Sequence, residues 1–251
     1  MSSQMVSGVQ IHPLRPGIGA AAQGPVGAVA GSDMEVLLAR AGGARRRVRR
    51  GEYLYRLGAA FHALYGIRAG SFKSVLLTED GREQVTGFHM AGEVLGLDGI
   101  GSDSYAGDAV ALEDSEVVEI PFEQLDALAC REPALQRELF RLLAGEIQRE
   151  RALMLLLGSM RAEERLAAFL INMSQRLCAR GFSAHRFLLR MTREEIGSLL
   201  GLKLETVSRI LSRFQVEGLI GVRNREVEIA SMSALRAVIG RGDARREREA
   251  A

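Results

Sequence analysis

The chain of 251 residues is long enough for one large domain or two modest domains, each with its own core. Its hydrophobic content of 47% and charged content of 25% are ordinary for a soluble globular protein, and no uncharged apolar run is long enough to span a membrane. The N-terminal segment lacks the apolar block of a secretory signal. The two cysteines, Cys130 and Cys178, are too far apart to build a disulfide framework or a zinc site alone. These features predict a cytoplasmic protein with no membrane contact.

The net charge of +2 conceals an uneven distribution along the chain. Residues 160–251 contain 17 Lys and Arg against 11 Asp and Glu, whereas residues 1–159 contain 16 against 20. A basic C-terminal third is typical of a nucleic-acid-binding module. Because many solvated surfaces are also basic, this interpretation depends on a motif in the same region.

The N-terminal segment lacks any periodic pattern of apolar residues, and a strongly basic segment follows it. Residues 1–32 are rich in Gly, Ala, Ser and Pro and predict a disordered arm, and a short helix is expected over 33–41. The arginine-rich run over 45–50 predicts a solvated edge strand, because charge on an edge strand discourages aggregation.

Between residues 51 and 121, short apolar runs alternate with turns that contain glycine. The clearest runs cover 64–67, 74–78, 84–90 and 117–120. Asp80-Gly81 lies between two of them and predicts a hairpin, because Gly readily adopts the positive φ of tight turns. Many short strands with such turns predict a β-roll or barrel.

A long helical pattern follows Pro133, which suits the first turn of a helix, and we expect it to stop at Gly158. Apolar residues recur at spacings of three, four or seven and exceed what packing on a β-roll requires. This excess favours a dimer seam over a helix buried within one chain. The seam is predicted at Leu139, Leu143, Ile147, Met154 and Leu157.

Glu150 lies on the same stripe between two apolar residues and allows two interpretations. Facing carboxylates across a two-fold axis would repel and keep the dimer marginal. Alternatively, Glu150 lies at the edge of the seam and pairs with the partner's Arg149 or Arg151.

Two short helical patterns joined by a glycine turn predict a helix-turn-helix. Thr192 and Glu195 form a capping box at the start of the first helix, since the hydroxyl accepts from the amide three residues on and the carboxylate reaches back. Gly201 suits the left-handed conformation that ends this helix. The second helix ends at Gly218, and the hairpin-like segment 219–230 predicts the wing of a winged helix.

The outward face of the second helix has side chains suited to reading DNA. Glu205, Ser208 and Arg209 share this face at helical spacing. Arg209 can donate two hydrogen bonds to guanine, Glu205 can accept from cytosine, and Ser208 can serve either base edge. The alternative is a solvated face with a Glu205–Arg209 ion pair, but the capping box, the glycine turn and the basic charge together favour DNA. Backbone phosphates are expected at Lys203, Thr206 and Arg213.

The segment 192–209 resembles the recognition unit of CRP/FNR transcription regulators, and 88–96, 119–122 and 162–168 resemble the FNR branch. The resemblance implies an α+β fold: a β jelly-roll, cyclic-nucleotide-binding-like sensor domain at 33–132, a dimerisation helix at 133–158, a winged helix-turn-helix at 159–240 and a charged tail at 241–251. It implies a non-enzymatic activator or dual regulator of anaerobic, respiratory or nitrogen-related genes that binds double-stranded DNA as a homodimer. The implied target is a palindrome of the form TTGAT-N4-ATCAA. The implied contact with RNA polymerase lies at Glu79, Asp80, Gly81, Arg82 and Glu83.

Two departures from the family remove its best-known cofactors. The FNR branch holds a [4Fe–4S] cluster with four cysteines, but the arm has none, Val118 stands at the fourth ligand position, and Cys130 and Cys178 match no ligand position. Gly92-Glu93 resembles the nucleotide-binding motif, yet no Lys or Arg between Glu93 and Cys130 could neutralise a phosphate. We therefore expect neither an iron–sulfur cluster nor cyclic AMP.

Other sensors and functions remain as alternatives. A β-roll metalloenzyme would need clustered ligands, but His62 and His89 are isolated, so no metal site is expected. A haem- or redox-dependent gas sensor on the same fold could use His62 or His89 as a haem ligand. Constitutive DNA binding and a thiol switch at Cys130 or Cys178 are the remaining hypotheses.

Overall fold

The computed structural model describes residues 40–78 and 80–249, with side chains described up to residue 240. The predicted arm over 1–32, most of the predicted helix over 33–41, and Glu79 lie outside the described residues. Only the end of that helix, Arg40 and Ala41, is described, and it is helical.

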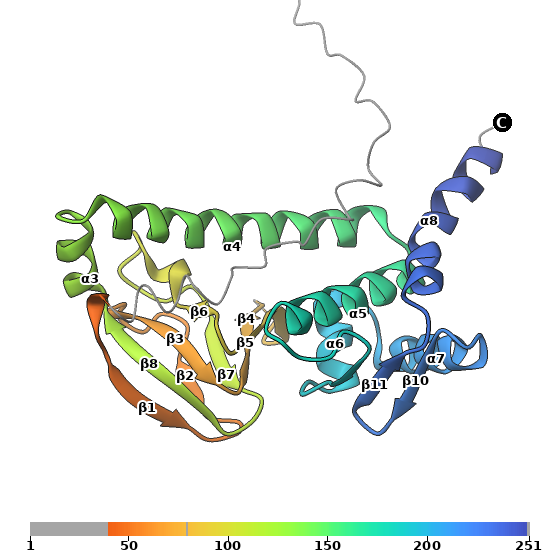
Figure 1. The fold of residues 1–251 in the computed structure, drawn as a ribbon, viewed down its shortest axis with the longest axis horizontal. Coiled ribbons are helices and arrows are strands. Elements are labelled where there is room, and N and C mark those ends of the chain that lie inside the picture. Colours follow the sequence, from red (N-terminus) through yellow and green to blue (C-terminus); the bar gives the residue numbers. More distant parts are fainter. Residues whose placement is uncertain (1–39, 79, 250–251) are drawn as a thin grey trace, which may run out of the picture.

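Two four-stranded antiparallel sheets form the N-terminal β-roll, as the sequence predicts (Figure 1). The first sheet contains, in spatial order, β1 (Ala44–Val48), β8 (Ser115–Pro121), β3 (Ala63–Ala69) and β6 (Val94–Leu95). The second contains β2 (Tyr53–Tyr55), β7 (Asp108–Ala111), β4 (Ser71–Leu77) and β5 (Glu83–Met90).

The basic run and the hairpin both lie where the sequence places them. β1 is an edge strand, and Arg45, Arg46 and Arg47 are exposed on it. The β4–β5 hairpin turns at Asp80-Gly81, where Gly81 has a φ of 80°. Its backbone amide donates to the Thr78 carbonyl at 2.8 Å, which closes the turn.

Helix α3 (Phe122–Ala129) leads into the long helix α4 (Pro133–Ser159), which begins at Pro133 as predicted. The predicted stop at Gly158 is wrong, because Gly158 is still helical. The helix ends when Met160 adopts an extended conformation, so no left-handed glycine is needed there. Figure 1 shows α4 lying along one side of the molecule, over both the β-roll and the C-terminal module.

The predicted seam on α4 is wrong at its first positions. Leu139 is only 8% exposed and packs with Leu135 and Leu142 against the chain's own β-roll, and Leu143 packs beside them. The large apolar side chains that α4 exposes are Phe140, Ile147, Met154 and Leu155, while Leu157 is half-buried. A stripe of apolar residues at mixed spacings does not show which face of the helix packs on the β-roll. The first turns of α4 are apolar on both faces, so the sequence could not separate the two.

The C-terminal module is a winged helix-turn-helix. Its helices are α5 (Ala162–Cys178), α6 (Arg193–Leu200), α7 (Leu204–Val216) and α8 (Met232–Glu249). A three-stranded sheet of β10 (Ile220–Arg223), β11 (Glu226–Ile229) and β9 (Arg186–Leu188) supplies the wing. Helix α8 crosses the expected boundary between residues 240 and 241. None of the helices in the described part of the chain is long and apolar enough to cross a membrane.

Candidate nucleic-acid interface

Helix α7 has one buried and one exposed face. Val207, Ile210, Leu211 and Phe214 are buried in the module's core. Glu205 and Arg209 are exposed on the opposite side, and Ser208 is half-buried beside them. The three side chains that the sequence singles out for base reading therefore lie together on an accessible helix surface.

The start of the helix-turn-helix is fixed by the predicted capping box. The Thr192 hydroxyl accepts from the Glu195 amide at 3.1 Å, and the Glu195 carboxylate accepts from the Thr192 amide at 2.7 Å. Gly201 ends α6 with a φ of 63° in the left-handed region. These contacts hold α6 and the turn into α7 in one geometry.

Arg193 is a contributor that the sequence analysis missed. Its Nη1 donates to the Ser208 hydroxyl oxygen at 3.2 Å, so it links the first turn of α6 to the middle of α7. Because the oxygen accepts from Arg193, the Ser208 hydroxyl proton is left to donate to a base edge or a phosphate. The only sequence signal is an arginine directly after the cap residue Thr192.

Gly197 is a second position that the sequence analysis missed. The Leu202 amide donates to the Gly197 carbonyl at 2.8 Å, which brings the turn close against α6. A Cβ at position 197 would lie 2.5 Å from the Leu202 carbonyl oxygen. The angle between the two helices therefore requires glycine at this position.

We expect Gly197→Ala to lower the free energy of unfolding by about 1–3 kcal/mol, because the clash is with backbone and no side-chain rotation relieves it. Urea unfolding followed by circular dichroism measures the change. Gly240→Ala is the matched control, because Gly240 is also helical and its added Cβ meets nothing within 4 Å. That variant should be neutral or up to about 1 kcal/mol more stable. Equal effects of the two substitutions would contradict the prediction.

The expected phosphate-contacting residues differ in their surroundings. Lys203 is exposed at the start of α7, and Thr206 is half-buried. Arg213 is exposed but pairs with Glu163, and its Nε donates to Glu217 at 2.8 Å. A phosphate at Arg213 would therefore compete with two carboxylates of the same module.

The loop expected to touch RNA polymerase is the exposed tip of the β4–β5 hairpin. The Asp80 carboxylate accepts from the Arg82 Nε at 2.7 Å and from the Thr78 hydroxyl. The hydrogen bond from Arg82, followed by that from Thr78, holds the pKa of Asp80 below its ordinary value. Gly81 and Glu83 are exposed beside it, so residues 80–83 present a charged surface to solvent.

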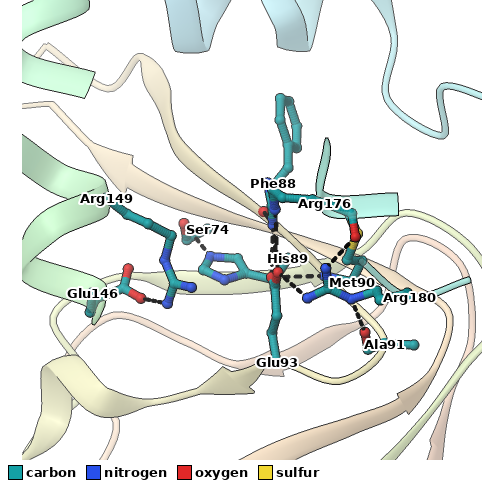
Figure 2. A network of polar contacts seen from close by, with 10 residues as sticks. All are labelled: Ser74, Phe88, His89, Met90, Ala91, Glu93, Glu146, Arg149, Arg176 and Arg180. Carbon is teal, nitrogen blue, oxygen red and sulfur yellow. Dashed lines mark hydrogen bonds and ion pairs between the residues drawn. The ribbon is translucent and has the colours of Figure 1, made fainter. Parts of the chain in front are cut away.

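The Glu93 carboxylate is buried and paired with two arginine side chains. It is 1% exposed and lies between the guanidinium groups of Arg176 on α5 and Arg180 in the turn directly after α5 (Figure 2). Its oxygens accept from Arg176 Nη2 at 2.7 Å and from Arg180 Nη2 at 2.6 Å. The sequence analysis missed both arginines.

The histidines and cysteines lie in separate places. His62 is exposed, with Nδ1 3.1 Å from the Ala60 carbonyl oxygen, whereas His89 is buried, with Nε2 3.1 Å from the Ser74 hydroxyl. Cys130 and Cys178 are exposed on different domains. Over the residues that the structure describes, no three His, Cys, Asp or Glu side chains cluster in a way that could hold a metal ion.

Sequence comparisons match both domains to known families. Residues 164–238 match the Crp-like helix-turn-helix domain, and residues 45–132 match the cyclic nucleotide-binding domain. The transcriptional regulatory protein btr of Bordetella pertussis is 48% identical over 196 residues, 78% of this chain and 81% of that protein. The fumarate and nitrate reduction regulatory protein of Escherichia coli is 45% identical over 196 residues, 78% of each chain.

A comparison of folds gives the same result. The structure of FixK2 from Bradyrhizobium japonicum aligns with a TM-score of 0.73 at 32% sequence identity. The alignment covers 78% of this chain and 96% of that one. The similarity therefore includes both the β-roll and the winged helix-turn-helix.

Proposed function

Because this chain belongs to the CRP/FNR family of transcription regulators, we propose that it binds a palindrome of the form TTGAT-N4-ATCAA as a homodimer. The observation that supports this target is the exposed face of α7, where Glu205, Ser208 and Arg209 lie together. Two such faces about 34 Å apart suit successive major grooves of one palindrome. A duplex with this sequence should bind about 1,000-fold or more tighter than a scrambled duplex in the same salt.

The dimer forms along the exposed face of α4. Phe140, Ile147 and Met154 are 58%, 49% and 67% exposed and lie seven residues apart, which places them on one line. A helix of 27 residues is about 40 Å long, so the line runs over much of the molecule. Pairing with a second copy would remove these large apolar side chains from water.

Glu150 limits the stability of this dimer. It is exposed on α4 between Ile147 and Met154, so the two copies of its carboxylate come close across the two-fold axis. We expect Glu150→Ala to tighten the dimer and to raise DNA affinity at low protein concentration. Analytical ultracentrifugation measures the dimerisation constant, with Gln148→Ala, on the other side of the helix, as the control. A weaker dimer in Glu150→Ala would support pairing with a partner's arginine instead.

The regulated genes follow from the names of the relatives. A fumarate and nitrate reduction regulator is among them, so we propose control of anaerobic, respiratory or nitrogen-related genes, with activation as the main outcome. The hairpin tip at Asp80–Glu83 is suited to contact RNA polymerase because it is exposed and charged.

DNA binding requires neither an iron–sulfur cluster nor a cyclic nucleotide. The chain has two cysteines, both exposed and on different domains, and Val118 is a buried strand residue, so the side chains do not fit a cluster with four thiolates. A cyclic nucleotide does not fit either, because the Glu93 carboxylate is already bound by Arg176 and Arg180.

We therefore expect DNA affinity to be the same in air and under nitrogen, with or without an iron chelator, to within about twofold. Fluorescence anisotropy with the labelled palindrome measures this affinity. The visible absorption spectrum of the same sample serves as a control, because a cluster or a haem absorbs there. Protein that is brown when purified and loses DNA affinity in air would contradict the prediction.

A further inference from the structure

The two domains are joined by a buried ion cluster of three side chains, Glu93, Arg176 and Arg180, here called the interdomain lock. Glu93 lies between β5 and β6 of the β-roll, whereas both arginines lie on α5 or directly after it, in the DNA-binding module. Figure 2 shows both guanidinium groups directed at the one carboxylate. The lock therefore connects segments more than 80 residues apart in the chain.

Backbone groups complete the hydrogen bonding of the lock. Arg176 Nη2 also donates to the Phe88 carbonyl at 2.6 Å, and Arg180 Nε donates to the Ala91 carbonyl at 2.6 Å. The Met90 amide donates to Glu93 at 3.2 Å. Each charged group thus has several directed partners, which is the condition for burying charge without a large loss of stability.

An apolar contact surrounds the lock and points to the same arrangement. Phe88 on β5 meets Phe169 on α5 edge to face, with ring centroids 6.1 Å apart. Val75, Val85 and Met90 of the β-roll belong to the same hydrophobic cluster as the core of the DNA-binding module. Both the ion pairs and the apolar packing therefore fix the position of α5 against the β-roll.

Helix α6 adds polar contacts between the module and the β-roll. Lys73 of β4 pairs with Glu195 at 2.9 Å, and the Val85 amide donates to the Ser198 hydroxyl at 2.8 Å. None of these contacts uses the base-reading side chains of α7, which remain accessible. The docked arrangement orients the module without covering its DNA-reading face.

We propose that the interdomain lock takes the place of an effector: it holds the DNA-binding module in the orientation that binds DNA, so that no ligand is needed. The inference rests on the proposed DNA-binding function. The carboxylate of the nucleotide-type motif is neutralised by Arg176 and Arg180 of the same chain, and these ion pairs connect the β-roll to the module. Two recognition helices of a dimer meet one palindrome only if their spacing is fixed, and a fixed orientation lowers the entropic cost of binding.

Glu93→Gln and Arg180→Gln test the lock. The first removes the negative charge and keeps the shape of the side chain, whereas the second removes the guanidinium group that donates to Glu93 and to the Ala91 carbonyl. Each variant should bind the palindrome at least tenfold more weakly than the wild type by fluorescence anisotropy. The double variant should bind no more weakly than Glu93→Gln, since both changes remove the same interaction. Arg68→Gln is the control: it removes a partly exposed ion pair with Glu116, in which both partners belong to the β-roll, and should leave affinity unchanged.

Spin labels on Cys130 and Cys178, which are exposed on opposite sides of the domain junction, report the orientation directly. Labelled chains diluted with cysteine-free chains give the distance within one chain by double electron–electron resonance. We expect one narrow distance distribution in the wild type and a broad one in both variants. Arg180→Gln keeps the Glu93–Arg176 pair and so remains testable if Glu93→Gln does not fold.

Unchanged or tighter DNA binding by a folded variant overturns the proposal, whatever the distances show. Weaker DNA binding with an unchanged distance distribution also overturns the proposal, because the loss of affinity would then not come from a change in the module's orientation. If the wild type itself does not bind the palindrome, the proposed DNA target fails. The distance measurement still decides in that case whether the lock fixes the orientation of the module.

Discussion

Replacing Arg209 with alanine is expected to weaken binding to the palindrome by about 1–3 kcal/mol and to relax the choice at one G·C pair. Arg209 is exposed on the outward face of α7, one turn from Glu205, with its guanidinium free to enter a major groove. Truncation of Arg209 removes both hydrogen bonds of a bidentate contact with guanine. The loss of affinity is therefore larger for the palindrome than for other sequences. Anisotropy titrations against the palindrome and against duplexes with each base at that position measure both effects.

Arg213→Ala provides the comparison on the same helix. Arg213 already pairs with Glu163 and Glu217, so at most it positions the backbone of the DNA. Its replacement should weaken binding to all duplexes by a similar and smaller factor. An equal loss on specific and random DNA for Arg209→Ala would remove Arg209 from the base-reading set.

Acid is expected to weaken the fold through Glu93. Burial alone would raise the pKa of this carboxyl, but Arg176 and Arg180 lower it to about 2, below its ordinary value of 4.5. A lowered pKa in the folded state stabilises the fold fully above pH 4.5, and this contribution is lost as the pH falls toward 2. The shift corresponds to about 3 kcal/mol at neutral pH.

Urea unfolding of the wild type and of Glu93→Gln at pH 7 and pH 3 measures this contribution. At pH 7 the variant should be about 3–5 kcal/mol less stable, since it leaves two buried guanidinium groups without their anion. At pH 3 the difference should shrink by about 2 kcal/mol, because the carboxyl of the unfolded chain is then protonated whereas that of the folded chain is still mostly ionised. Arg68→Gln, at a partly exposed pair, should change stability by less than about 1 kcal/mol at either pH. A difference that does not change with pH would contradict the assigned pKa.

Local sequence signals predicted much of the fold. Asp80-Gly81 identifies the hairpin because only a few residues accept a positive φ, and the Thr192–Glu195 spacing identifies a helix start because the capping box depends on neighbours in sequence. Such signals need no knowledge of distant segments. The outward placement of Glu205 and Arg209 follows from helical periodicity in the same way.

Contacts between distant segments were beyond the reach of sequence patterns. Arginine is a residue type that usually faces solvent. Arg176 is buried only because Glu93 faces it from the other domain. Arg193 stays exposed, but its hydrogen bond to Ser208 also forms only after the turn between α6 and α7 has folded. On α4, the apolar stripe predicts burial, but it does not say whether Leu139 or Phe140 faces the chain's own β-roll.

The shared apolar cluster bears on how this chain folds. The matched domain families end and begin on either side of α4, at residues 132 and 164, so the sequence comparison divides the chain into two units. Yet Val85, Phe88 and Met90 of the first unit are buried together with the core of the second. A fragment of either unit alone would expose this surface to water and be prone to associate. The chain is therefore expected to unfold in one calorimetric transition, as a single cooperative unit, although two domain families match it separately.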